Sequence, residues 1–481
     1  MKFYVTTPIY YVNGAPHIGH AYTSIAADSM ARWNRMQKTP TFFLTGTDEH
    51  GSKIVQAAKA AGKDTAEFVD DIAKKFQDLK ETLDLSWDDF IRTSDKDKHW
   101  PGAEALWGKI EEAGDIYERE YEGLYCVGCE AFVTERDLVN GLCVDHKKAP
   151  ELIKEKNLFF KLSKYSDQIK EAIASEKMLI EPESRRNEIL AFIDEGLEDV
   201  SFSRSRDKLH WGIPVPGHPD QTMYVWCDAL SNYISAIGYG KDEEEFRKWW
   251  PADVHVIGKD ILRFHAAIWP GMLLSAGLDL PKRIYVHGFI TSEGEKMSKT
   301  IGNVIDPVEL SNKYGSDALR YYLLRDIPSH EDGDFSIARF EERYNADLAN
   351  GIGNFASRVS TLAEGIDSFE GLEASDEIKA KIKDTIEAAA ANAERFRLHE
   401  VVARIWELIS FGDMYVNDNK PWESKDPQVI FNALYLLSNL ADLISPIIPK
   451  AGATIKEAIA QEGGVIKSVK KIENLFPRLN K

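Results

Sequence analysis

The chain has 481 residues, of which 43% are hydrophobic and 28% charged, and its formal net charge is −19. A chain this long exceeds one ordinary core, so we expect a globular protein of two to four domains. No apolar run approaches the ~20 residues that cross a bilayer, and the first 14 residues lack a signal-peptide pattern. The acidic balance argues against a broadly basic surface, so any RNA contact must depend on local basic patches and stacking.

The first 115 residues alternate strand and helix patterns. Residues 3–7 form a β-rich stretch, and a helical pattern from Ile18 to Met36 ends at Thr39-Pro40. Residues 41–44 predict a buried strand, which runs into the loop 46–51. Asp64 with Glu67 resembles a capping box and opens a helix with the apolar stripe Phe68, Ile72, Phe76, Leu79 and Leu83. This alternation indicates a parallel α/β sheet, in which ligands bind beyond the carboxyl ends of the strands.

The character of the chain changes between residues 116 and 228. This stretch holds a cysteine cluster, several Gly/Pro breaks and the basic residues Arg204, Arg206 and Lys208. Strands resume at 254–257 and at Arg283–Ile290, so the stretch is predicted to be an insertion in a sheet that continues after it. Beyond about residue 345 helices dominate, and a helical face through Val401 ends near Pro421.

The first motif with chemical potential is the segment 16–20, PHIGH, where a strand gives way to a helix. Residues three apart lie on one helical face, so the imidazoles of His17 and His20 can face one ligand. Open amides at a helix start attract anions, and Gly19 permits a close approach to the backbone. The combination suits a triphosphate; the alternative is a histidine pair that only caps the helix.

A metal-site pattern follows in the insertion. Cys126-x2-Cys129 and Cys143-x2-His146 supply four soft or borderline ligands with the spacing of a structural zinc site. With all four positions filled by protein, no site remains for a reactive water. The alternative is three buried thiols and an unrelated histidine. Such cysteine usage favours a reducing, cytoplasmic compartment.

The third motif is the segment 296–300, KMSKT, which follows a strand and a loop containing Gly294. Asp306 and Pro307 look like the cap and first turn of a helix, which places the motif between a strand and a helix. Lys296 and Lys299 on a mobile loop can neutralise phosphate charge. The alternative is an ordinary solvated lysine loop.

Together the first and third motifs resemble the two signatures of class I aminoacyl-tRNA synthetases. Within that class the chain resembles the methionyl-tRNA synthetase family from end to end, through the segments 8–14, 46–51, 224–229, 257–261, 264–265 and 286–288. Thr300 departs from the serine of many relatives but keeps a hydroxyl.

The resemblance implies a Rossmann-type parallel sheet that is split by a zinc-binding insertion and followed by an all-α helical bundle. The expected segments are 1–115 and 229–295 for the catalytic domain, 116–228 for the insertion, 296–345 for the lysine loop and a linking segment, and 346–481 for an anticodon-binding domain.

The resemblance also implies a reaction. ATP and L-methionine form methionyl-adenylate and pyrophosphate, and the methionyl group then passes to the 3′ end of tRNA(Met), for translation initiation and elongation. The methionine carboxylate needs no general base, so positioning and charge stabilisation should supply the rate. His17, His20, Lys296 and Lys299 are the candidates for the phosphates, with Mg²⁺ bridging them. The ATP site implied by the family is Asn13, His17, Gly19, His20, Gly258, Asp260, Lys296, Lys299 and Thr300.

Asp48 is implied as the partner of the α-ammonium of methionine, although it could be a plain turn aspartate. The side chain of methionine offers an apolar stem and a weakly accepting sulfur, which suits an apolar, aromatic pocket. The implied methionine site is Ile9, Tyr11, Asp48, Trp226, Ala229, Tyr233, Ile261 and His265. For each lining residue the alternative is ordinary core packing.

The resemblance implies one structural Zn²⁺ per subunit on Cys126, Cys129, Cys143 and His146. In the helical region it implies that Asn354, Arg358, Pro421 and Trp422 meet the tRNA anticodon, with Trp422 as a stacking platform. The alternative for Trp422 is a core tryptophan between helices. We expect a monomer and no membrane association. Two alternatives stay open, namely a non-catalytic relative that only binds tRNA or a partner, and a ligase for another amino acid of similar bulk.

Overall fold

The computed structural model describes residues 2–126, 131–133, 138–144, 147–297, 302–364, 366, 369–462 and 465–479. Contacts divide the chain into two compact units that are interleaved in sequence. Unit 1 comprises Met1–Pro16, Thr39–Asp78 and Trp87–Val286, and unit 2 comprises His17–Lys38, Leu79–Ser86 and His287–Lys481. None of the described helices combines the length and the apolar composition that a membrane crossing requires.

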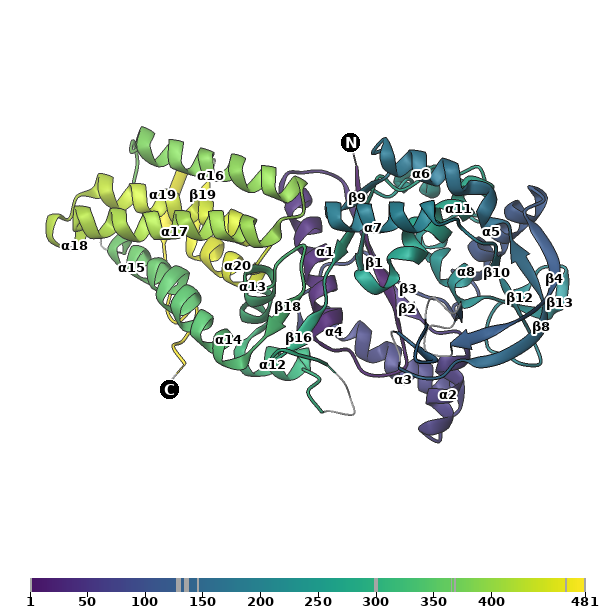
Figure 1. Ribbon diagram of the computed structural model, residues 1–481. Coiled ribbons are helices and arrows are strands. Elements are labelled where there is room, and N and C mark those ends of the chain that lie inside the picture. The colour runs from purple at the N-terminus through teal and green to yellow at the C-terminus, as the bar shows by residue number, and fades with distance from the viewer. Residues whose placement is uncertain are drawn as a thin grey trace. The chain divides into compact units, whose positions relative to one another are not determined.

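The centre of unit 1 is a six-stranded sheet (Figure 1). Its strands, in spatial order, are β3 (Asp89–Arg92), β2 (Thr41–Asp48), β1 (Phe3–Tyr11), β14 (Val254–Gly258), β15 (Arg283–His287) and β9 (Leu179–Glu181). β1 pairs in parallel with both β2 and β14, so the strand order changes direction between β1 and β14. Ligands of open α/β sheets bind beyond the strand ends at such a point. The predicted parallel sheet is therefore confirmed.

Helices of unit 1 follow the sheet strands, as the alternating pattern predicts. They are α2 (Ser52–Ala60), α3 (Thr65–Gln77), α5 (Trp100–Glu112), η2 (Leu162–Tyr165), α6 (Ser166–Ala174), α7 (Glu183–Asp194), α8 (Val225–Leu230), α9 (Asn232–Ser235), α10 (Glu243–Trp249), η3 (Lys259–Ile261), η4 (Phe264–Ile268) and α11 (Trp269–Ser275). Trp107, Trp269 and Tyr4 are fully buried in the core that these helices share with the sheet.

The stretch 116–228 adds smaller antiparallel sheets and also the edge strand β9 of the main sheet. Its strands are β4 (Ile116–Cys126), β5 (Ala131–Val133), β6 (Leu138–Val139), β7 (Leu142–Cys143), β8 (Glu151–Phe160), β10 (Val200–Ser201), β11 (Ser203–Ser205), β12 (Pro214–Val215) and β13 (His218–Met223). β4 and β8 pair along their length, from Ile116↔Phe160 to Tyr125↔Glu151. Arg204, from the basic cluster of the sequence, is buried in an ion pair with Glu155 at 2.9 Å.

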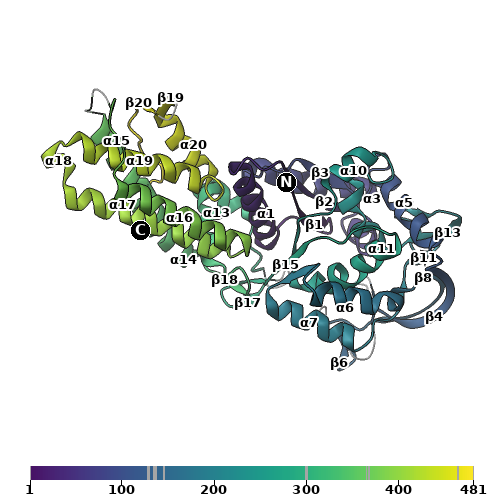
Figure 2. The same cartoon turned by 90° about the horizontal axis from the view of Figure 1, so that it is seen from above.

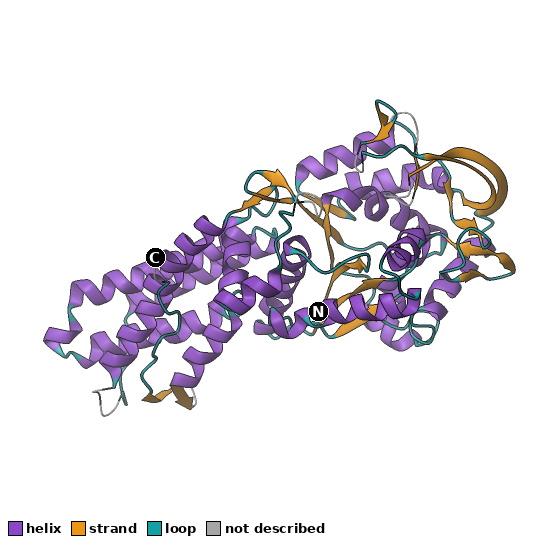
Figure 3. Cartoon of the chain, turned by 90° about the horizontal axis from the view of Figure 1, so that it is seen from below, coloured by secondary structure: helices purple, strands orange, loops and turns teal. Residues whose placement is uncertain are grey.

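Unit 2 is mostly helical (Figure 2). Its helices are α1 (Ile18–Met36), α4 (Leu79–Thr82), α12 (Pro307–Tyr314), α13 (Ser316–Asp326), α14 (Ile337–Arg343), η5 (Tyr344–Gly353), α15 (Asn354–Ala363), α16 (Asp376–Glu394), α17 (Leu398–Asn419), α18 (Pro421–Ser424), α19 (Pro427–Ile444) and α20 (Pro449–Ala458). Its strands are β16 (Ile290–Ser292), β17 (Glu295–Lys296), β18 (Gly333–Phe335), β19 (Ile459–Glu462) and β20 (Val465–Val469), and Figure 3 shows how few they are among the helices.

A buried charge cluster joins the sequence-distant parts of unit 2. Arg320 on α13 is fully buried, and its guanidinium lies 2.7 Å from a carboxylate oxygen of Asp28 on α1. The same guanidinium donates to the carbonyl oxygens of Ile447 at 2.8 Å and Pro446 at 3.0 Å. Asp28 also accepts from the backbone and hydroxyl of Ser86, each at 2.6 Å. Four segments of the chain therefore meet at one ion pair.

Two predicted elements are interrupted in the structure. The expected strand Arg283–Ile290 is two strands, because β15 ends at His287 and β16 pairs with β18 instead. Gly288 lies at the break, where a Cβ would stand 2.2 Å from the carbonyl oxygen of Glu331. The expected helix through Leu83 likewise ends at Gln77, and the segment Leu79–Ser86 belongs to unit 2.

Candidate active site

The eight side chains expected to line the amino-acid pocket all belong to unit 1. They are Ile9 and Tyr11 on β1, Asp48 on β2, Trp226 and Ala229 on α8, Tyr233 on α9, Ile261 on η3 and His265 on η4. Tyr11 and Asp48 are register partners at the carboxyl ends of β1 and β2, and η3 and η4 follow the carboxyl end of β14. The set thus gathers around the strand ends where the order of the sheet reverses.

Two irregularities in the strands shape this edge of the sheet. The register between β1 and β2 shifts between Thr6 and Ile9, around Pro8, because proline cannot donate a ladder hydrogen bond. A shift of this kind re-aims the side chains that follow it. In β2, a Cβ on Gly46 would stand 2.1 Å from the carbonyl oxygen of Ile91, so only glycine fits there.

Trp226 forms an aromatic wall in this group. Its ring stacks on Phe264 with centroids 3.7 Å apart and an interplanar angle of 8°. It meets Tyr11 edge-on at 6.4 Å and His265 edge-on at 6.2 Å. A wall of this kind can contact a thioether side chain through its ring faces and edges.

A chain of hydrogen bonds orients two polar side chains of the expected pocket, His265 and Tyr233. His265 Nδ1 lies 2.9 Å from the carbonyl oxygen of Ile261, which can only accept, so this nitrogen carries the hydrogen. His265 Nε2 then accepts from the hydroxyl of Tyr233 at 2.7 Å. Tyr233 also stacks on His255 at 4.1 Å. Burial lowers the pKa of His265 to about 4, so the ring is neutral at physiological pH.

The histidine motif of unit 2 forms a reciprocal cap on α1. His17 Nδ1 accepts from the amide of Gly19, and His20 Nδ1 accepts from the amide of His17, each at 3.1 Å. The rings stack with centroids 3.8 Å apart. Because both Nδ1 atoms accept, the Nε2 atoms carry the hydrogens and are oriented donors. The amide of Ile18 bonds to the carbonyl of Ile305 at 3.1 Å, so the expected open amides of the first turn are in part engaged.

The lysine motif follows a hairpin, and the chain downstream of it contacts this cap. β16 and β17 form a hairpin through Glu293 and Gly294, whose φ values of 52° and 79° suit a tight two-residue turn. Downstream, Ile305 bonds to the start of α1, and Asp306 caps α12 through its side chain at 2.7 Å from the amide of Val308. The predicted cap at Asp306 is therefore confirmed. The segment 298–301 and the side chain of Lys296 are not described.

The remaining residues of the expected ATP site are spread over both units. Asn13 follows β1, Gly258 ends β14 and the exposed Asp260 lies on η3, all in unit 1. Gly19 lies in the first turn of α1, and Lys299 and Thr300 lie outside the described residues. The ATP roles of these residues stay predictions.

Two of the four expected zinc ligands lie together. Cys126 and Cys143 are each 2% exposed and share one apolar cluster with Val133. Cys143 ends a hairpin whose turn residues, Asn140 and Gly141, both have positive φ. Cys129 and His146 lie outside the described residues. Among those described, no three His, Cys, Asp or Glu side chains are arranged for a metal ion.

The expected anticodon residues lie at one end of the helical region. The Arg358 guanidinium donates to Asp413 at 3.3 Å and to Asn417 at 2.8 Å, and it lies 5.6 Å from the ring centroid of Trp422. Trp422 is 47% exposed, which is not the placement of a core tryptophan. Asn354 is the first residue of α15 and is exposed, whereas Pro421 is buried as the first residue of α18.

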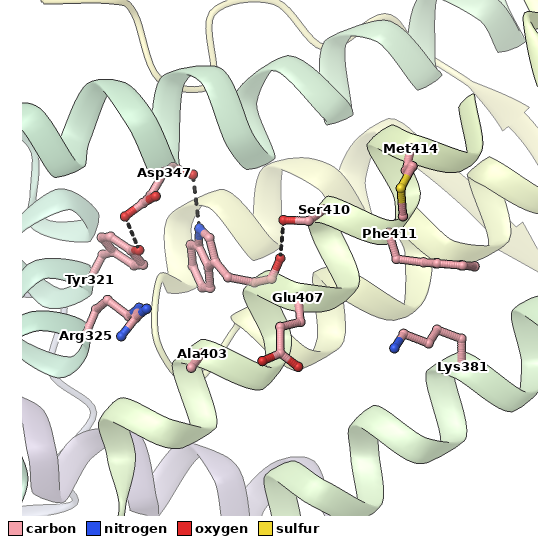
Figure 4. Close-up of a pocket in the computed structure, with 10 residues that line it drawn as sticks. Tyr321, Arg325, Asp347, Lys381, Ala403, Glu407, Ser410, Phe411 and Met414 are labelled. Atoms are coloured by element: carbon pink, nitrogen blue, oxygen red, sulfur yellow. Dashed lines mark hydrogen bonds between the residues drawn. The ribbon is translucent and has the colours of Figure 1, made fainter. Parts of the chain in front are cut away.

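A groove of about 440 Å³ in unit 2 was not foreseen from the sequence (Figure 4). It is lined by Tyr321, Arg325, Asp347, Lys381, Ala403, Trp406, Glu407, Ser410, Phe411 and Met414. Several wall groups bond to one another, since Tyr321 donates to the Asp347 carboxylate at 2.8 Å and Trp406 donates to the Asp347 carbonyl at 3.0 Å. The charges of Arg325 and Lys381 balance those of Asp347 and Glu407, so the groove favours neither an anionic nor a cationic ligand.

Sequence reasoning also missed a buried polar group, two members of which are close in sequence to the expected pocket residues Asp48 and Trp226. His50 and Asp228 stand inside segments that carry the family resemblance but were given no role, and His99 stands in no motif. Asp228 lies 2.6 Å from His50 and 2.7 Å from His99. Their spacing in sequence gave no signal, because the three meet only in the folded sheet.

Comparison with known proteins identifies the class. A family model described as "tRNA synthetases class I (M)" matches residues 3–148 and 135–360, which is more than half of the chain. The chain therefore belongs to the class I tRNA synthetases.

Individual relatives narrow the assignment to one family. The methionine–tRNA ligase of Thermotoga maritima is 43% identical over 96% of this chain and 76% of its own length. That of Mycobacterium tuberculosis is 42% identical over 95% and 92%. A solved structure of the Mycobacterium tuberculosis methionyl-tRNA synthetase in complex with methionyl-adenylate matches with a TM-score of 0.94, at 38% identity and over 99% of this chain and 100% of that one. The chain is a member of the methionine–tRNA ligase family.

Proposed function

We propose that the chain activates L-methionine with ATP and transfers the methionyl group to tRNA(Met). The observation that carries this proposal is the gathering of Asp48, Trp226, Tyr233 and His265 around the carboxyl ends of β1, β2 and β14. An apolar aromatic wall beside the buried carboxylate of Asp48 suits a substrate with an ammonium group and a thioether side chain. The solved relative that was captured with methionyl-adenylate supports the same reaction.

The activation step joins the methionine carboxylate to the α-phosphorus of ATP, while the bond from that phosphorus to the pyrophosphate oxygen breaks. The substrate carboxylate is ionised at neutral pH and needs no base. We assign His17 and His20, whose Nε2 hydrogens are fixed by the cap on α1, to the phosphate oxygens together with Lys296 and Lys299. These donors stabilise the charge that develops on pyrophosphate, and Mg²⁺ accompanies ATP.

Asp48 is 2% exposed at the end of β2, and we assign it to the α-ammonium of methionine. Because Asp48→Asn replaces a charged contact by a neutral one, it is expected to raise the KM for methionine about 10–100-fold in ATP–pyrophosphate exchange. Asp71→Asn, which alters a carboxylate with a 51% exposed side chain in the same unit, serves as the matched control. An unchanged KM for methionine in Asp48→Asn would refute this role.

The exchange assay across all twenty amino acids tests the whole proposal. Methionine should be the preferred substrate, although an apolar pocket separates near-isosteres by only ~1–3 kcal/mol. No methionine-dependent exchange at saturating substrate would favour a relative that binds tRNA without catalysis. Exchange that prefers leucine or isoleucine would move the assignment to another amino acid.

We further propose one structural Zn²⁺ on Cys126, Cys129, Cys143 and His146. The fit rests on the burial of Cys126 and Cys143 in one cluster beside a tight hairpin turn. A four-ligand protein site has no open position, so the ion would hold the fold of the insertion rather than react.

Elemental analysis of freshly reduced protein tests this site. About one zinc per chain is expected, and Cys126→Ser or Cys143→Ser should abolish the binding. Cys227→Ala is the control, because Cys227 is a buried thiol in the main core, outside the cluster. Retention of zinc by Cys143→Ser would contradict the assignment.

The helical region is proposed to recognise the anticodon through Asn354, Arg358, Pro421 and Trp422. The exposed Trp422 ring beside the Arg358 guanidinium offers an unstacked base both a π-face and a cation. The chain is further proposed to act as a monomer in the cytoplasm.

A further inference from the structure

A buried carboxylate held by two imidazoles lies in unit 1. Asp228 is 1% exposed, His99 is fully buried and His50 is 4% exposed. Asp228 Oδ2 lies 2.6 Å from His50 Nδ1, and Asp228 Oδ1 lies 2.7 Å from His99 Nε2. Each carboxylate oxygen therefore has its own imidazole partner.

The chemistry of these contacts fixes the direction of each bond. An ionised carboxylate only accepts, so His50 Nδ1 and His99 Nε2 carry the hydrogens. The other nitrogen of His99, Nδ1, lies 2.9 Å from the hydroxyl of Ser235. Burial raises the pKa of Asp228, but the two histidines outweigh it and hold that pKa below its ordinary value. The group is thus a charged, oriented network rather than a set of neutral core side chains.

The three members belong to three different segments of unit 1, two of which also carry expected methionine-site residues. His50 follows Asp48 by two residues, in the loop between β2 and α2, and Asp228 lies on α8 between Trp226 and Tyr233. His99 precedes α5 and provides the third point of attachment. The contact from His50 to Asp228 therefore ties the loop of the proposed ammonium site to the helix of the aromatic wall.

The residue between Asp48 and His50 is clamped as well. Arg92 donates to the Glu49 carboxylate at 2.7 Å, and the Trp211 indole donates to the Glu49 carbonyl at 2.5 Å. The amide of Glu49 donates to the hydroxyl of Thr93 at 2.9 Å. With Glu49 fixed in this way, the His50–Asp228 bond is the connection that sets the loop against α8.

We propose that Asp228 is a positioning residue, which sets the spacing between Asp48 and the Trp226 wall through His50 and His99. This inference rests on the proposed function, because it assigns Asp228 to methionine selection in that same pocket. A buried charge is costly to desolvate, and an apolar side chain could fill the same volume. Next to a binding site, such a network instead fixes the positions of the residues that contact the substrate, here Asp48 and Trp226.

The first test is Asp228→Asn in steady-state exchange, with methionine and ATP varied separately. The amide has one accepting oxygen, so one imidazole contact is lost and the pocket spacing relaxes. The KM for methionine should rise about 10–100-fold, the size of effect that follows a displacement near 1 Å. The KM for ATP should stay within about twofold. A joint rise of both KM values would show general damage and overturn the positioning role.

Matched pairs at the two histidines separate chemistry from packing. His99→Gln and His50→Asn keep an N–H donor near the position of the bonding nitrogen, whereas His99→Leu and His50→Leu remove it. The Gln and Asn variants should retain a KM for methionine within about threefold of the parent, and the Leu variants should behave like Asp228→Asn. Equal effects within each pair would contradict the proposal, even if Asp228→Asn fails to fold.

The parent protein distinguishes this inference from the proposed function. If the parent shows no methionine-dependent exchange, the proposed function itself fails. If the parent exchanges normally while the Leu variants keep its KM for methionine, only the positioning role is overturned.

Discussion

Arg320→Met is expected to lower the free energy of unfolding of unit 2 by about 3–5 kcal/mol, because the buried Asp28 carboxylate loses its fully buried cation and keeps only the partly exposed Arg32. The Asp28 carboxylate is fully buried and lies 2.7 Å from the guanidinium. Burial raises the pKa of Asp28, but Arg320 and Arg32 outweigh it and keep the group ionised. The change also leaves the carbonyl oxygens of Pro446 and Ile447 without their donors. Urea unfolding followed by tryptophan fluorescence measures the loss.

Arg32→Met is the matched control for this experiment. Arg32 contacts the same carboxylate at 2.7 Å, but its side chain is 22% exposed and it lies on the same helix as Asp28. Arg320 still neutralises Asp28 in this variant, so we expect a loss of about 1 kcal/mol. If the two variants unfold at the same urea concentration, the buried pair is not the main attachment within unit 2.

The free energy of unfolding should fall by about 5 kcal/mol in total between pH 6.5 and pH 5, because the three buried histidines His255, His265 and His287 are neutral in the fold. Burial lowers the pKa of His265 and of His287 from 6.5 to about 4. In this pH window the unfolded chain binds a proton at each histidine and the folded chain does not. Each therefore loses about 1.6 kcal/mol of stabilisation between pH 6.5 and pH 5, and the loss continues until the pH falls through the pKa of the folded state.

His287→Asn should remove about one third of this pH dependence. His287 Nδ1 lies 2.8 Å from the carbonyl of Gly288, and an asparagine amide can donate to the same oxygen without titrating. His218→Asn, at a side chain that is 38% exposed, should leave the dependence unchanged. Urea titrations at pH 6.5, 6, 5.5 and 5 give the slopes. A flat profile in the parent protein would show that none of the three rings is held neutral.

Local patterns predicted the elements that depend on neighbours in sequence. The apolar face of α1, the cap of Asp306 on α12 and the end of α17 near Lys420 all follow from spacing and cap chemistry within a few residues. The parallel sheet followed from the alternation of strands and helices.

The sequence could not predict features that depend on distant backbone. The strand beyond His287 stops because Gly288 lies against Glu331, which is remote along the chain. The helical stripe from Phe68 to Leu83 is continuous in period, yet its last two members pack in the other unit. The period of apolar residues predicts which face of a helix is buried, but it does not predict against which core that face packs.

In the candidate site, too, some residues were predicted from the sequence and others were not. Resemblance identified Asp48, Trp226 and His265, and the structure gathers them at the strand ends. The resemblance gave no role to Asp228, whose hydrogen-bond partners His50 and His99 are 178 and 129 positions away along the chain. Nothing in a single sequence distinguishes His99 from a surface histidine until the fold buries it.

The interleaving of the two units limits how the polypeptide can be divided. A fragment starting at residue 287 would contain Arg320 but neither Asp28 nor Ser86, so it would bury a guanidinium without its counter-ion. Any truncation or split-gene version that preserves the helical half must supply 17–38 and 79–86 as well. Unit 2 can therefore be moved into another protein only together with these two segments from the first half of the chain.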